Sequence, residues 1–186
     1  MLKKLIVIFL VVFLAACGTK EEKGSTEESK EPEMVEVTIP SIFFDGVPDE
    51  QIIAEAEKLG ISETTVGEEK RNVTYVMTKE KQDELLEGLE ENLDDFFEYL
   101  LKTLSSFKGI DHNKQYDDFT VTVNKEDYLK DGNVEGYGAL GILQRARYYH
   151  YFKGTSEEDI KITLTVKDEE TEEVIEKVVY PDDVEK

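Results

Sequence analysis

A long amphipathic segment, residues 78–107, constrains the fold more than any other part of the sequence. Its apolar residues recur at three- and four-residue intervals and its acidic residues occupy the opposite side, which predicts a helix with one apolar face. Thr78 can serve as the N-cap of this helix. Membrane-surface helices usually carry basic polar faces, so we expect this one to pack against a sheet or another helix. Its apolar positions are Leu85, Leu86, Leu89, Leu93, Phe96, Phe97, Leu100, Leu101 and Leu104.

Short stretches of alternating apolar and polar residues on both sides of this helix predict β-strands. A second helix is expected between Pro48 and Gly60, and a third over residues 134–152. Because most strands are joined by short turns, they should pair as antiparallel hairpins. The predicted fold is α+β, an antiparallel sheet of hairpins with about three helices packed on one face. The predicted strands cover residues 35–39, 63–66, 73–77, 110–116, 119–123, 160–166 and 174–180.

The beginning of the chain has the order of a secretory signal peptide. Two lysines precede an apolar run over residues 5–13, and two alanines lead to Cys17, the only cysteine. A permanent transmembrane helix needs roughly 20 apolar residues, whereas polar residues begin directly after Cys17. Residues 1–16 are therefore predicted to be a signal peptide that is removed.

The residues Leu14-Ala15-Ala16-Cys17, followed by Gly18, resemble the lipobox of bacterial lipoproteins. The whole chain looks similar to small lipoproteins of Gram-positive bacteria, a likeness that implies no activity. The resemblance implies cleavage between Ala16 and Cys17 and acylation of Cys17, which would hold the protein on the outer face of the cell membrane. Several acyl chains would anchor it durably, because each buried CH₂ contributes about 0.8 kcal/mol. The alternative is an ordinary signal peptide with a spare cysteine.

A disordered acidic tether is predicted to follow the lipidated cysteine, so that residues 17–33 form one segment. Residues 18–33 contain no large apolar side chain and cannot bury enough surface to fold. A flexible chain of this size reaches roughly 20 to 25 Å, which exceeds the Debye length of about 8 Å. Residues 34–186 are predicted to form a single extracytoplasmic α+β domain.

The chain is strongly acidic, with 43 Asp and Glu against 22 Lys and Arg and a formal net charge of −21. Such a balance argues against nucleic acid as a partner, because few cations are available to neutralise phosphates. It also argues against docking on anionic lipid headgroups. Membrane contact is therefore expected through the acyl chains alone. Solubility is an alternative reason for the acidity.

Three motifs resemble known sites without meeting their requirements. Residues 136–141 match G-x-G-x-x-G, but no predicted strand leads directly into the glycines. Residues 127–132 resemble the start of a calcium loop, yet Leu129 stands where an oxygen ligand is needed. His112 and His150 have no matched triad, and no serine lies in a G-x-S-x-G context. We therefore predict no catalytic residue, no metal site and no cofactor.

Aromatic and basic residues gather near the end of the third predicted helix. Neighbouring helix residues point in different directions, so some of them should be exposed, and Tyr and Arg are favoured anchors at protein interfaces. The alternative is that the rings cover the edge of the core while their hydroxyls reach water. The candidate interaction surface consists of Arg145, Arg147, Tyr148, Tyr149 and Tyr151.

These features favour a surface lipoprotein whose domain binds a protein, a peptide or another envelope component without catalysing a reaction. An enzyme or metal-dependent accessory that uses the glycine-containing third helix around His150 is the first alternative. A cleft that holds His150 beside carboxylates of shifted pKa would favour it. A structural or stress-related envelope protein without a discrete ligand is the second alternative.

Overall fold

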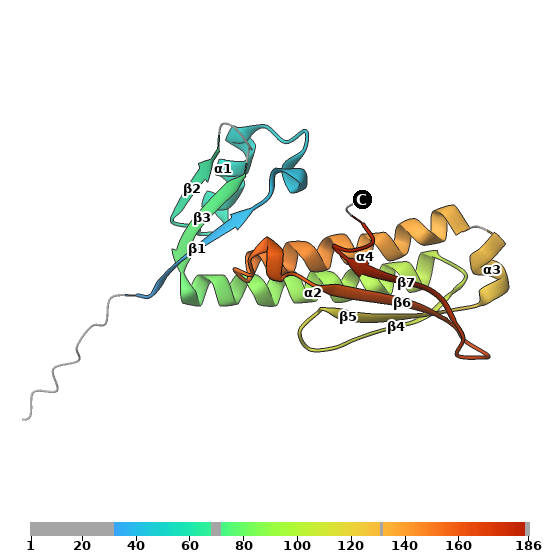
Figure 1. Cartoon of the computed structure of the whole chain (residues 1–186). Helices are drawn as coiled ribbons and strands as arrows, with labels where there is room; N and C mark the ends of the chain where they lie inside the picture. Colours follow the sequence, from blue (N-terminus) through green and yellow to red (C-terminus); the bar gives the residue numbers. More distant parts are fainter. Residues whose placement is uncertain (1–31, 68–71, 131, 185–186) are drawn as a thin grey trace, which may run out of the picture. The chain divides into compact units, whose positions relative to one another are not determined.

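Helix α2, Lys79–Thr103, is the longest of the described helices (Figure 1). The structure is a computed structural model, and it describes residues 32–67, 72–130 and 132–184. The predicted signal peptide, the lipidation of Cys17 and nearly all of the tether lie outside the described residues. Contacts between residues group Pro32–Lys186 into one unit, to which the following description applies.

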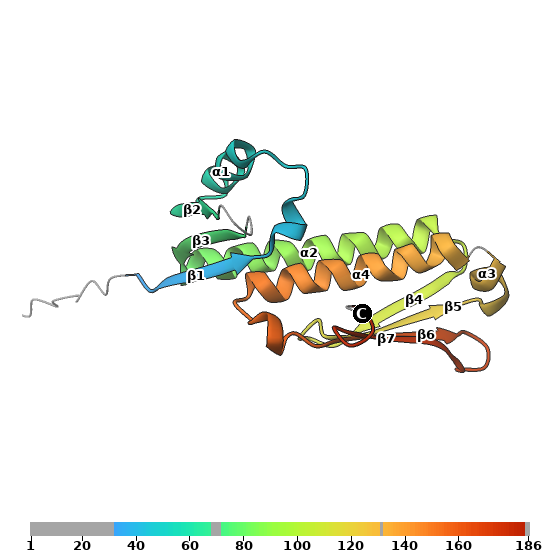
Figure 2. The ribbon, with the colours of Figure 1, turned by 45° about the horizontal axis from the view of Figure 1, so that its top comes forward.

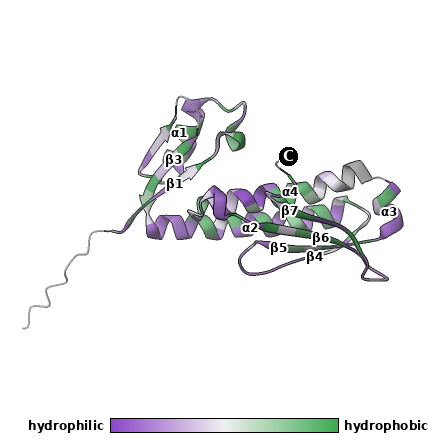
Figure 3. Ribbon diagram, in the orientation of Figure 1, coloured by the Kyte–Doolittle hydropathy of each residue, from purple (hydrophilic) through white to green (hydrophobic). Residues whose placement is uncertain are grey.

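The sequence predicts the start of α2 correctly. Thr78 is the N-cap, and its hydroxyl oxygen accepts a hydrogen bond of 3.1 Å from the backbone N–H of Lys81. Hydrophilic and hydrophobic residues alternate along the helix (Figure 3). The helix ends at Thr103, with Leu104 as its C-cap, rather than at residue 107, because Phe107 already pairs with Val123 in a sheet and is buried there. None of the described helices combines the length and the apolar character that a membrane span requires.

Four strands form one sheet in the order β4-β5-β6-β7, namely Phe107–His112, Asp118–Val123, Ile162–Asp168 and Val174–Tyr180. The pairs β4–β5 and β6–β7 are antiparallel hairpins, as the alternating patterns predict. Strands β5 and β6, however, are parallel, an exception in this sheet to the predicted antiparallel pairing. The physical reason is the connection between them. Helices α3, Lys125–Lys130, and α4, Gly132–Phe152, carry the chain back to the starting end before β6 begins.

A second sheet has three antiparallel strands in the order β1-β3-β2, where the fold prediction expected one sheet. The strands are β1, Met34–Ile39, β2, Glu63–Val66, and β3, Val73–Thr78. Between β1 and β2 lie the 3₁₀ helix η1, Ser41–Phe44, and helix α1, Asp49–Lys58. Helix α1 starts at Asp49, so Pro48 is its N-cap rather than its first helical residue as predicted, and the helix ends at Lys58. Gly60 follows the C-cap Leu59 with a φ of 79°, which is unfavourable for other residues and fits the predicted stop. A short 3₁₀ helix, η2, Glu157–Asp159, precedes β6.

Helices α2 and α4 form a layer on one face of the four-stranded sheet (Figure 2). The ring of Phe97 on α2 meets that of Phe119 on β5 edge-on, with centroids 6.1 Å apart. Tyr75 on β3 lies against Phe152 at the end of α4, so the same helix layer also contacts the three-stranded sheet. The α+β fold is thus confirmed. The outer face of the four-stranded sheet carries half-buried threonines that alternate with buried apolar residues.

Two glycines of the G-x-G-x-x-G sequence let α2 and α4 approach each other closely. A Cβ at position 138 would lie 2.6 Å from Leu104 Cδ1, and one at position 141 would lie 2.9 Å from Phe96 Cζ. Both glycines are inside α4 rather than at a turn between a strand and a helix. The motif therefore serves helix packing, and no phosphate-binding turn is present at these residues.

Gly138→Ala is expected to lower the free energy of unfolding by about 1 kcal/mol. Overpacking at the contact with Leu104 is unfavourable by about 1–3 kcal/mol, and the better helix propensity of alanine offsets up to about 1 kcal/mol. Gly88→Ala on α2 is the matched control, because a Cβ there has nothing within 4 Å and should raise stability. Urea unfolding followed by circular dichroism compares the two. An equal gain in both variants would contradict the close packing.

Candidate functional site

The candidate interaction residues on α4 divide between the surface and the core. Arg145 is exposed, and Arg147 and Tyr148 are half-buried. Tyr149 and Tyr151 are only 5% and 4% exposed, so their assignment to an exposed surface is wrong. The Tyr149 hydroxyl donates a 2.8 Å hydrogen bond to Glu90 on α2, and Tyr151 packs against the ring of Phe43. These two rings are buried because α4 is covered on more than one side, by α2 at Tyr149 and by η1 at Tyr151.

Arg145 and Tyr148 border a groove between α2, α4 and η1. The groove has a volume of about 300 Å³, and we call it the seam groove. The ring of Phe43 stands edge-on to that of Tyr148, with centroids 5.3 Å apart, and bounds the groove at the η1 side. Neutral polar side chains come from both helices, Asn92 from α2 and Gln144 from α4. The residues that line the seam groove are Phe43, Leu89, Asn92, Leu93, Gln144, Arg145 and Tyr148.

A second cavity of about 300 Å³ also has Phe43 and Tyr148 in its lining, and we call it the α1 cavity. Apart from Glu55 and the Tyr hydroxyls, the side chains that line it are apolar. The edge-on Phe43–Tyr148 pair therefore belongs to both hollows. The remaining lining residues are Phe44, Val47, Ile52, Glu55, Ala56, Leu59, Ile61, Tyr75 and Phe152.

Burial raises the pKa of Tyr148 from its ordinary value of 10 to about 12, so its phenol, which is already neutral at physiological pH, stays neutral even in strongly alkaline solution. Burial also raises the pKa of Tyr75, and the neighbouring Tyr148 and Glu55 add to that shift. Tyr148 thus contributes an apolar ring with one polar atom, a combination suited to recognition.

Arg145 is held against its own protein. Its guanidinium lies 3.5 Å from the centre of the Phe96 ring, and Nη1 donates a long hydrogen bond of 3.4 Å to the Gly141 carbonyl. Burial lowers the pKa of Arg145, although the group stays charged at neutral pH. The floor of the groove therefore contains a cation that is already partly satisfied.

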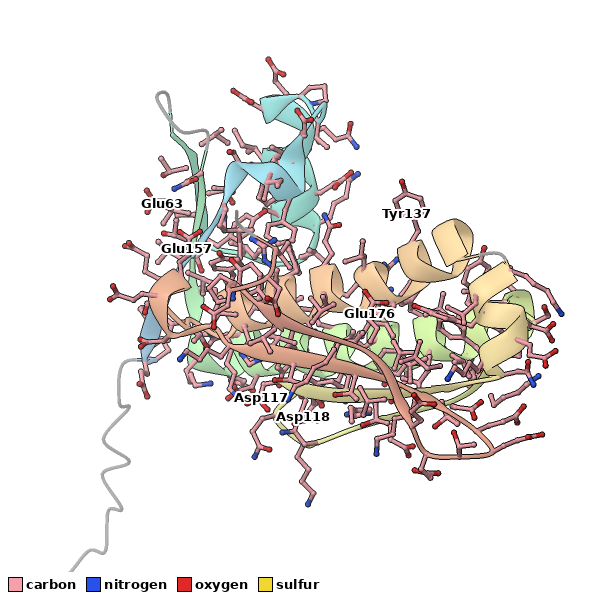
Figure 4. The ribbon with its side chains drawn as sticks, turned by 45° about the vertical axis from the view of Figure 1, so that its right-hand side comes forward. Glu63, Asp117, Asp118, Tyr137, Glu157 and Glu176 are labelled. Carbon is pink, nitrogen blue, oxygen red and sulfur yellow. The ribbon has the colours of Figure 1, made fainter. Side chains whose placement is uncertain are left out.

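Among the described residues, the α4 side of the groove carries no carboxylate, although the protein as a whole is highly acidic. Residues 136–152, most of α4, include no Asp or Glu. On α2, Leu89, Asn92 and Leu93 face the groove, other apolar residues face the core, and the exposed acidic residues lie on the solvent side. Tyr137, which is 74% exposed, projects from α4 away from the four-stranded sheet and extends the same side of the helix (Figure 4). The result is a carboxylate-free strip that contains Arg145, within an acidic surface. The exposed acidic residues of α2 are Glu80, Asp83, Glu84, Glu87, Glu91, Asp94, Asp95 and Glu98.

Both histidines meet at Tyr116 in the β4–β5 turn. The His112 ring stacks on the Tyr116 ring at 4.4 Å, and His150 Nε2 lies 3.1 Å from the Tyr116 carbonyl oxygen. His150 is 7% exposed, and burial lowers its pKa despite the hydrogen bond to Tyr116. A buried imidazole that fixes a backbone carbonyl has a structural role here, because it is not open to a substrate.

Of the residues 127–132 that resemble the start of a calcium loop, residues 127–130 belong to α3 and Gly132 begins α4. Asn124 Oδ1 accepts a 3.1 Å hydrogen bond from the backbone N–H of Asp127, which satisfies an N–H group of the first turn. The Asp127 carboxylate pairs with Lys130 at 3.1 Å. Within residues 32–67, 72–130 and 132–184, no three His, Cys, Asp or Glu side chains are grouped so that they could hold a metal ion.

Comparison with protein-family models, with curated proteins and with solved structures gives no match. The function must therefore be inferred from the site itself.

Several residues of the seam groove escaped the sequence prediction. Leu89 and Leu93 are part of the predicted apolar stripe, but the pattern does not say that they remain accessible. Phe43 lies in a short 3₁₀ segment without periodicity. A usable signal was present, since residues 136–152 lack acidic residues in a chain that has 43 of them.

His150→Gln is expected to weaken the pH dependence of stability in mild acid. The folded-state pKa of His150 lies below its ordinary value of 6.5, so the unfolded chain binds the proton first. The free energy of unfolding is then fully present above about pH 6.5 and falls as the pH drops towards the folded-state pKa, by at most about 1.4 kcal/mol per pH unit. Glutamine can still donate to the Tyr116 carbonyl but does not titrate. Urea unfolding between pH 7 and 5 measures the slope, and an unchanged slope would contradict this account.

Proposed function

We propose that this protein is a membrane-anchored lipoprotein, held through Cys17 on the outer face of the bacterial membrane, whose domain binds a protein or peptide through the seam groove. The protein acts by binding rather than by catalysis. The observation that carries the proposal is the groove itself, an apolar and carboxylate-free depression in a protein of net charge −21.

The groove has the composition of a binding site centre. Interface centres are depleted of charged residues and enriched in aromatic residues, and their rims are polar. Phe43 and Tyr148 supply the aromatic rings, and Asn92 and Gln144 supply neutral hydrogen-bonding groups. Arg145 is the one charged side chain among the lining residues. Acidic residues surround the strip on α2. Repulsion between like charges would exclude many acidic proteins from this site.

The predicted tether fits the same function. A flexible chain of roughly 20 to 25 Å would carry the domain away from the anionic membrane surface, where its own negative charge is repelled. The domain could then turn the seam groove towards partners in the envelope.

Cys17→Ser is expected to abolish lipidation. The serine hydroxyl cannot form the thioether, so the protein should be released without lipid or remain an unprocessed precursor. Metabolic labelling with palmitate and fractionation of the producing cells measure this. Label that persists on the variant would refute the assignment of Cys17.

A photoreactive residue in place of Gln144 is expected to form a discrete covalent adduct in the cell envelope, because Gln144 is exposed and borders the groove. The same residue in place of Thr163, on the outer face of the four-stranded sheet, is the control. The full chain is expressed in its producing cells, and mass spectrometry identifies the adduct. No adduct at position 144, or the same adducts at both positions, would contradict binding through the groove.

A further inference from the structure

We propose that the partner which occupies the seam groove is a basic amphipathic helix. This inference rests on the proposed function and adds the chemistry of the partner. Apolar side chains on one face of that helix would contact the groove, and its Lys and Arg residues would contact the acidic border.

The first argument is the shape of the site. Helices α2 and α4 run antiparallel. Gln82 near the start of α2 donates a hydrogen bond to the Phe152 carbonyl at the end of α4, whereas Gly138 near the start of α4 lies against Leu104, just after the end of α2. Two antiparallel helices leave a linear depression between them, which suits the apolar ridge of a third helix. The exposed side of α4 from Tyr137 to Tyr148 is about 16 Å long at 1.5 Å per residue. This length matches about three turns of a docked helix.

The second argument is the polarity of the floor. Leu89, Leu93 and the ring of Tyr148 are apolar, and the neutral pair Asn92 and Gln144 can serve backbone or side-chain groups at the edge of the helix. Burying a lysine on this floor would be unfavourable, since none of the lining side chains is a carboxylate and the Arg145 guanidinium lines the same groove. The part of the partner that enters the groove is therefore apolar.

The third argument is the charge of the border. Asp95 follows Asn92 by three residues on α2 and therefore lies beside the groove. Asp45 comes directly after η1, next to the Phe43–Phe44 pair, and Glu55 lines the neighbouring α1 cavity. All three side chains are exposed. Basic residues on the flank of the helix would thus meet Asp95 at the α2 border, whereas Asp45 and Glu55 line neighbouring hollows and add negative charge from a greater distance.

The charge of the whole protein acts in the same direction. A net charge of −21 attracts cationic partners over distances of about a Debye length and accelerates their association. A second copy of the chain would bring the same acidic borders together, and an acidic helix would meet them with like charge. Both are disfavoured by the surface that favours a basic partner.

Two designed peptides test the proposal. One carries Leu at i, i+3, i+4 and i+7 with Lys at all other positions, and the other has the same leucines with Glu in place of Lys. Fluorescence anisotropy measures binding of each labelled peptide to the full chain in phosphatidylcholine nanodiscs, with empty nanodiscs as the blank. We expect the Lys peptide to bind at least tenfold more tightly than the Glu peptide. Its Kd should rise as salt is added, because salt screens the attraction between opposite charges.

Two variants with the same change in charge locate the binding. Gln144→Lys places a cation in the seam groove and should weaken binding of the Lys peptide at least tenfold. Thr163→Lys places it on the outer face of the four-stranded sheet and should change the Kd less than twofold. Equal effects of both variants would show diffuse attraction to an acidic surface and overturn the proposal.

The remaining outcomes separate this proposal from the proposed function. The Glu peptide could bind as tightly as the Lys peptide, and Gln144→Lys could weaken the binding of both. That result would overturn the proposal that the partner is basic but would leave the groove as the binding site. Self-association in sedimentation that Gln144→Lys abolishes would assign the groove to a second copy instead. If neither peptide binds but the adduct at position 144 forms, the helix chemistry is wrong and the proposed function stands. If both fail, both proposals fall.

Discussion

The close packing of α2 against α4 is the contact on which the rest of the domain depends. Gly138 and Gly141 allow the two helices to approach each other where larger residues would collide with Leu104 and Phe96. The paired helices then present one side to the four-stranded sheet through Phe97, while the end of α4 contacts the three-stranded sheet through Phe152. The seam groove lies along the same contact between α2 and α4, on the side that η1 covers only in part. Fold and candidate site thus have a common origin.

Much of the fold could be predicted because it is locally encoded. The spacing of leucines defines α2, the Thr78 hydroxyl defines its start, and the alternation around residues 119–123 and 160–166 defines β5 and β6. The division into two sheets and the parallel pairing of β5 with β6 could not be predicted from such patterns. Both depend on where α4 places the chain, and α4 has small or apolar residues on most of its circumference instead of one apolar face. Periodicity therefore identifies the helix but not the surfaces it covers.

The same limit applies to the candidate site. Arg145 and Tyr148 were selected because aromatic and basic residues are conspicuous in an acidic chain, and the structure places both beside the seam groove. Tyr149 and Tyr151 were selected on the same grounds, but they occupy the core. Composition alone does not distinguish these pairs, because consecutive helix positions differ by about 100° and only the neighbouring elements decide which positions are covered. Phe43 was missed because its contribution arises from a short turn that the fold brings onto α4.

The parallel pairing of β5 with β6 has a consequence for how the domain acquires its structure. The hairpins β4–β5 and β6–β7 can form between residues that are close in the sequence. The same holds for the pairing of β2 with β3 in the three-stranded sheet. The two halves of the four-stranded sheet, in contrast, can join only after the whole segment between Val123 and Ile162 has closed a loop. Contacts between distant residues slow folding because the entropy of loop closure is lost before they form. The joining of β5 to β6 across α4 is therefore the step that should set the folding rate, and glycines that ease the docking of α4 act on that rate as well as on stability.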